Sequence, residues 1–152
     1  MATTFFYLSI IAMLILFIIC YKFRKPTLAS IVIGLTTVGY SLISDIILGD
    51  QLKLFYYISP QQSTFYMVLS ALLIYSILNI LYTMFLPQKG KHALVYTFCW
   101  IVVLLLFEYT TIVTKTIVFT GWAPFPWSLV TYIVAYAWIY CLHRYLAKKM
   151  PA

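Results

Sequence analysis

The stretch YKFRKPTLASIVIGLTTVGYSLISDIIL, residues 21–48, decides the fold of this chain. It begins with a basic cluster of Lys22, Arg24 and Lys25 and continues as an apolar run over residues 28–48. About 20 helical residues span the ~30 Å hydrocarbon core of a bilayer, so this run predicts a transmembrane helix with a basic end. Four further apolar runs lie outward from it, at residues 5–21, 65–85, 93–119 and 127–146.

The basic residues are concentrated in every second gap between these runs. The first gap, the third gap and the C-terminal tail hold eight of the ten: Lys22, Arg24, Lys25, Lys89, Lys91, Arg144, Lys148 and Lys149. The second and fourth gaps hold one each, Lys53 and Lys115. Because positive charge is retained on the cytoplasmic side, this bias predicts an N-terminus outside and a C-terminus inside.

The composition excludes a water-soluble domain. The chain is 64% hydrophobic and only 9% charged, and its five runs leave no segment long enough to fold separately. We therefore predict an all-α bundle of five transmembrane helices that forms one membrane domain over residues 1–152. The net charge of +7 lies at helix ends, where anionic lipid headgroups attract it, so the expected partner is the bilayer and not nucleic acid.

Small and polar residues form a stripe along the second run. They recur at three- and four-residue spacing, which places them on one helix face: Ser30, Gly34, Thr37, Ser41 and Asp45. Small residues allow helices to approach closely in lipid, so we expect the second run to be the central helix, and the stripe could also join copies in a homo-oligomer. Asn79 lies with Tyr75 and Tyr82 on a face of the third run that should also turn toward a neighbour.

The chain has three acidic residues, and two of them fall at similar depth. At about 1.5 Å rise per residue, Asp45 and Glu108 both lie roughly 22–26 Å from the inner ends of their helices. Lys115 follows Glu108 by two turns on the same expected helix face. We expect these three residues to form a cluster near the outer surface, joined by Asp50 and Tyr109.

Three interpretations of this cluster are open. Ionisable residues within membrane spans are costly and commonly mark ion, proton or ligand sites. Alternatively, an internal ion pair could hold the second and fourth helices together while Lys115 extends toward the outer surface. The third interpretation is simple exposure at the surface.

Metal and catalytic patterns are missing from the sequence. The cysteines and histidines have no C-x-x-C or H-x-x-x-H spacing: Cys20, Cys99, Cys141, His92 and His143. We therefore predict no metal and no cofactor. No hydrolase, metalloprotease or phosphate-loop motif is present, so the remaining enzymatic possibility is Glu108 or Asp45 as a lone general base toward a lipid-linked substrate.

The segment from Phe107-Glu108 through Lys115 to Gly121-Trp122, together with Asp45, resembles a family of small multi-pass membrane proteins of endospore-forming bacteria. The resemblance extends from about residue 24 to the C-terminus. It implies a bacterial plasma-membrane location and marks Asp45, Glu108 and Trp122 as site candidates. It implies no activity, substrate or cofactor.

These observations predict a non-enzymatic protein that binds either a partner membrane protein or a ligand reached from outside. The chief alternative is a small transporter or channel subunit that uses Asp45 and Glu108 for cations or protons. A membrane enzyme acting on a lipid-linked substrate is the second alternative. Five helices can enclose little polar volume, so we do not expect transport through a single copy.

Overall fold

The computed structural model describes residues 1–150, and it is an all-α bundle with five helices long and apolar enough to cross a membrane. The predicted fold class and the predicted number of transmembrane helices are both confirmed. The spans are Ala2–Phe23, Leu28–Gln51, Ser63–Met84, Gly90–Val113 and Pro124–Lys149.

Three of the spans contain a short wide (π) turn. The first and fourth spans are the α-helices α1 (Ala2–Phe23) and α5 (Gly90–Val113). The second consists of α2 (Leu28–Asp45) and η1 (Ile46–Gln51), and the third of α3 (Ser63–Leu69), η2 (Ser70–Tyr75) and α4 (Ser76–Met84). The last begins with η3 (Pro124–Ser128) and continues as α6 (Leu129–Lys149).

Helix α2 begins where the sequence provides a cap. Pro26 precedes Thr27, which has an extended backbone and whose side-chain Oγ1 accepts a hydrogen bond from the Ser30 backbone N–H at 3.2 Å. Such a cap satisfies one of the free N–H groups at a helix start, which would otherwise be unpaired near the membrane surface.

The third span, and not the second, is the central helix. In its most apolar window 56% of residues are buried, against 17% in the second span. Both α1 and α2 pack against it, and Met67, Leu78 and Tyr82 carry its core-facing side chains. The expectation that the second span is central was wrong because a stripe of small residues brings one neighbour close, whereas a central position requires contacts on several faces.

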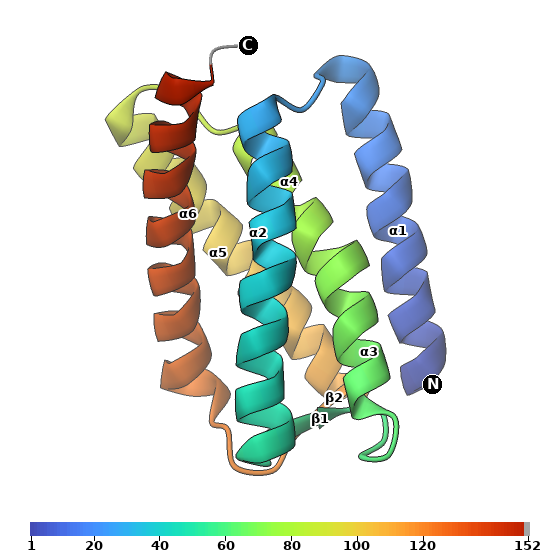
Figure 1. Ribbon diagram of the computed structural model, residues 1–152. Coiled ribbons are helices and arrows are strands. Elements are labelled where there is room, and N and C mark those ends of the chain that lie inside the picture. Colours follow the sequence, from blue (N-terminus) through green and yellow to red (C-terminus); the bar gives the residue numbers. More distant parts are fainter. Residues whose placement is uncertain (151–152) are drawn as a thin grey trace.

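Two short strands lie between the helix ends at one end of the bundle (Figure 1). Strand β1 (Phe55–Tyr57) pairs antiparallel with β2 (Ile117–Phe119), with Phe55 opposite Phe119. The predicted fourth run, residues 93–119, is therefore wrong at its C-terminal end, because the helix ends at Val113 and the chain turns at Lys115, whose φ is 57°. Hydropathy could not reveal this, since a β-branched apolar strand scores like the end of a helix.

The helices alternate in direction, so the basic residues separate between the two ends. In Figure 1, α1 begins at the end that carries the strands, and α6 ends at the opposite end. Eight basic residues belong to that opposite end, while Lys53 and Lys115 lie near the strands. Which end faces outward in a cell stays a prediction from the positive-inside rule.

Candidate ligand-binding cavity

A cavity of about 570 Å³ lies between α2, the third span, α5 and α6. This volume falls within the range of pockets that hold drug-sized ligands. Its walls are largely apolar and aromatic, and polar side chains are gathered toward its two ends. The expectation that five helices enclose little polar volume is not contradicted, because the wall of this cavity is largely apolar. Side chains do not fill the space between these four spans.

The end of the cavity nearest the strands, called the outer end because the basic residues predict that it faces outward, contains both acidic residues predicted to lie at similar depth. Asp45 approaches from the C-terminal end of α2 and Glu108 from α5. Glu108 is 9% exposed, and the Ser128 hydroxyl donates a hydrogen bond of 2.5 Å to its Oε1. Trp122 in turn donates its Nε1–H to Ser128 Oγ at 3.0 Å. Trp122 and Ser128 thereby orient the carboxylate of Glu108.

Asp45 is less completely satisfied. Its Oδ2 atom is buried and has no hydrogen-bond partner among residues 1–150, while the Tyr57 hydroxyl lies beside the carboxylate. Ser41, one turn away on α2, also lines the cavity with a buried hydroxyl that no described residue pairs. A buried polar group without a partner is costly, so each unpaired atom indicates a place for a further polar or charged group.

The other members of the predicted cluster lie outside the cavity. Lys115 is exposed in the turn that follows α5, so it is not two helical turns beyond Glu108 as predicted. Asp50 accepts a hydrogen bond of 2.7 Å from the Thr64 hydroxyl at the bundle surface. Tyr109 is 64% exposed on α5. Within the described chain, no Lys115 ion pair holds the second and fourth helices together.

The inner end of the cavity is closed by a hydrogen-bonded network centred on Asn79. The Asn79 amide nitrogen donates to Thr37 Oγ1 and to the Tyr40 hydroxyl, each at 3.0 Å. The Tyr136 hydroxyl donates to Asn79 Oδ1 at 2.7 Å and accepts from Trp100 Nε1 at 3.0 Å. Four helices are joined in this way. Sequence reasoning identified Asn79 but missed Trp100 and Tyr40.

The predicted helix-packing stripe serves two purposes along its length. Ser30 and Gly34 are buried, and an atom placed at the Cβ position of Gly34 would lie 2.6 Å from the Ile80 side chain on α4. Thr37 is also buried and receives the Asn79 hydrogen bond, whereas Ser41 and Asp45 face the cavity. The stripe therefore packs against α4 over its inner half and lines the cavity over its outer half.

The strand pair forms a roof over the outer end. Phe55, Ile117 and Phe119 line the cavity from β1 and β2. The Leu54 carbonyl accepts three backbone N–H groups, from Thr120, Gly121 and Trp122, at 2.9–3.1 Å. This multiple contact fixes the segment that carries Trp122 against the end of the second span.

The cavity opens sideways, along the groove between α2 and α6. Val134 and Trp138 line the cavity, although 63% and 60% of their surfaces are exposed. Ser44 and Thr131 also line the cavity and are exposed. These residues lie within the predicted spans. In a membrane the opening therefore faces lipid.

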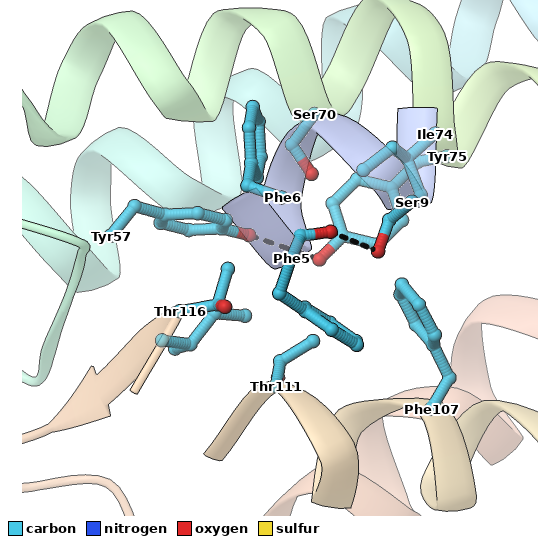
Figure 2. Close-up of a pocket in the computed structure, with 11 residues that line it drawn as sticks. Phe5, Phe6, Ser9, Tyr57, Ser70, Ile74, Tyr75, Phe107, Thr111 and Thr116 are labelled. Carbon is cyan, nitrogen blue, oxygen red and sulfur yellow. Dashed lines mark hydrogen bonds between the residues drawn. The ribbon is translucent and has the colours of Figure 1, made fainter. Parts of the chain in front are cut away.

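A second, much smaller cavity of about 20 Å³ adjoins the first, beside the N-terminal end of α1. Figure 2 shows the Tyr57 and Tyr75 hydroxyls meeting at its edge, where they are 3.0 Å apart. This volume has room for one water molecule. Both tyrosines also line the large cavity, and burial, reinforced by the charge of Asp45, raises the pKa of Tyr57 well above its ordinary value. Tyr57 therefore stays a neutral hydrogen-bond donor.

The only side chains of Asp, Glu, His, Lys or Arg on the cavity wall are the carboxyl groups of Asp45 and Glu108. No histidine, cysteine or lysine lines the cavity, and no group of three or more His, Cys, Asp or Glu residues could hold a metal ion within residues 1–150. A general base at this site would be a carboxylate, and the Ser128 hydroxyl is the hydroxyl that donates a hydrogen bond to Glu108. No protein-family model, curated protein or solved structure matches this chain.

Proposed function

We propose that this protein binds a small amphipathic ligand in the cavity between α2, the third span, α5 and α6. The cavity itself carries the proposal, because about 570 Å³ of largely apolar space with a few convergent polar groups is typical of a ligand site. A role that consisted only of binding a partner membrane protein would not require such a space inside one chain.

The side opening supports a ligand that arrives from the bilayer. The outer end is covered by the strand pair and Trp122, whereas the groove between α2 and α6 exposes Val134 and Trp138. With the N-terminus outside, as the basic residues predict, this groove opens toward the outer leaflet. We further propose a bacterial plasma membrane as the location, which the family resemblance implies.

Two alanines on α6 provide a matched test. Ala135 lines the cavity, while Ala137 is exposed on the helix and does not line it. The probe is an uncharged alkyl alcohol that carries an aryl diazirine, photolysed with the purified protein in lipid nanodiscs. Crosslinks mapped by mass spectrometry should fall on cavity residues such as Tyr132 and Ser41. Ala135→Trp should abolish these crosslinks, and Ala137→Trp should retain them. Equal labelling of both variants would contradict the proposal.

A second candidate, a small cation or proton transporter, is favoured by one observation. Asp45 and Glu108 face the same cavity, and Asp45 Oδ2 has no hydrogen-bond partner in the described chain. Carboxylates of this kind mark ion pathways in many membrane proteins. Reconstituted vesicles that show cation or proton flux, abolished by Asp45→Asn or Glu108→Gln in a folded protein, would favour this candidate.

A further inference from the structure

We propose that the ligand is a lipophilic organic cation, an amine or other onium group whose positive charge lies between Asp45 and Glu108. This inference rests on the proposed ligand-binding function and adds the chemical class of the ligand. It also adds an orientation, with the charged group toward the outer end and the apolar body toward α6.

The charges on the cavity wall are of one sign. Asp45 and Glu108 line it, and none of its lining residues is a lysine, an arginine or a histidine. A buried carboxylate without a cation is costly, and a hydrogen bond such as that from Ser128 to Glu108 offsets only part of this cost. The Oδ2 atom of Asp45 has no hydrogen-bond partner in the described chain. A bound cation would pair with both acids.

The aromatic lining favours a large organic cation. The electron-rich faces of tyrosine and tryptophan attract cations, and quaternary ammonium groups are recognised in this way. Seven such residues line the cavity: Tyr40, Tyr57, Tyr75, Trp122, Tyr132, Tyr136 and Trp138. Two of them lie close to Glu108. Trp122 is linked to Glu108 through Ser128, and Tyr132 lies directly beside Glu108.

A small metal cation fits this site poorly. Calcium takes six to eight oxygen ligands and magnesium requires near-ideal octahedral coordination, usually with several waters retained. The two carboxylates have no third acidic, histidine or cysteine partner that would complete a metal site in the described chain. The remaining wall is largely apolar, and it would accommodate carbon substituents better than a hydration shell.

The Asn79 network sets the orientation of the ligand. Both amide hydrogens of Asn79 are donated to Thr37 and Tyr40, and its oxygen accepts from Tyr136. The inner end therefore offers no free amide to a ligand, whereas the unpaired atoms of Asp45 and Ser41 lie further out along α2. A charged group is stabilised best at the outer end, which leaves the apolar body against Leu104 and Val134.

Two probe ions of nearly equal size and opposite charge test this inference. Tetraphenylphosphonium and tetraphenylborate are measured by equilibrium dialysis against the full-length protein in nanodiscs of neutral lipid, with empty nanodiscs subtracted. We expect the phosphonium ion to bind at least about tenfold more tightly than the borate. Asp45→Asn and Glu108→Gln should each weaken phosphonium binding by about tenfold, which corresponds to about 1.4 kcal/mol.

Asp50→Asn is the matched control, because Asp50 is an acid outside the cavity whose partner is Thr64. It should weaken phosphonium binding much less than the cavity variants do, because the Asp50 charge acts on Asp45 only at a distance. If a cavity variant does not fold, the comparison of the two ions on the wild-type protein still decides the outcome. Equal binding of both ions, while the uncharged diazirine probe still labels the cavity, would overturn the cation inference and leave the proposed function intact. Loss of diazirine labelling from the cavity as well would overturn both.

Discussion

Asn79 joins three helices directly and a fourth through Tyr136. Its amide contacts α2 through Thr37 and Tyr40 and α6 through Tyr136, which is bonded onward to Trp100 on α5. In lipid, hydrogen bonds between helices are worth about 0.6–2 kcal/mol each, because no water competes for the partners. This one residue therefore contributes much of the polar cohesion at the middle of the bundle.

We expect Asn79→Leu to lower the free energy of unfolding by about 1–3 kcal/mol, since three hydrogen bonds are lost and their partners stay buried. Thermal unfolding of the purified protein in detergent measures the change. Thr110→Val is the control, because the exposed Thr110 hydroxyl bonds only to the Phe107 carbonyl of its own helix. Stability equal to wild type for both variants would mean that the network contributes nothing.

Lys115 adopts a backbone conformation that favours glycine. Its φ is 57°, and a side chain in this left-handed region costs roughly 1–2 kcal/mol. We therefore expect Lys115→Gly to raise the free energy of unfolding by about 0.5–1 kcal/mol, after the greater chain entropy of glycine is subtracted. Lys89→Gly is the control, because Lys89 has an ordinary φ of −78°. A destabilised Lys115→Gly protein would contradict the idea that the lysine side chain strains this turn.

At the scale of elements, α2 contains two glycines in contrasting surroundings. A Cβ at Gly34 would lie 2.6 Å from Ile80, while nothing lies within 4 Å of one at Gly39. Gly34→Leu should cost about 1–3 kcal/mol through overpacking against α4. Gly39→Leu should be neutral or stabilising by up to about 1 kcal/mol, because leucine is the better helix former. Chemical unfolding of the two variants side by side measures the difference, and equal effects would contradict the close packing of α2 on α4.

The helices themselves could be predicted from the sequence, but the strands could not. Each apolar run is long enough to span a bilayer, and in lipid a helix satisfies its own backbone hydrogen bonds, so run length translates directly into structure. The pairing of Phe55 with Phe119 joins segments 64 residues apart and has no local signal. Its consequence, the early end of α5 at Val113, displaced Lys115 from the expected cluster.

At the scale of the whole molecule, the depth of Asp45 and Glu108 could be predicted, whereas the cavity could not. Depth follows from the rise per residue and from the shared direction of the two helices. A cavity depends on which side chains fail to fill the space between helices, and that is decided by the packing of all four neighbouring spans. Trp122 was marked only through the family resemblance, and its contact with Ser128 depends on how the last span begins.

Orientation in the membrane decides which leaflet supplies the ligand, and the basic residues predict it. Lys53 lies at the strand end of the bundle and Lys149 at the end of α6, with three spans between them, so they must face opposite sides of a membrane. Lys53→Cys and Lys149→Cys, each in a protein with Cys20, Cys99 and Cys141 replaced by alanine, are treated in intact cells with a membrane-impermeant maleimide.

We expect the maleimide to label Lys53→Cys in intact cells and Lys149→Cys only after permeabilisation, because eight basic residues hold the α6 end inside. The reverse pattern would place the cavity opening in the inner leaflet, and the ligand would then be a cytoplasmic amphiphile. Labelling of both positions from one side would mean an even number of crossings between them and would contradict the three intervening spans.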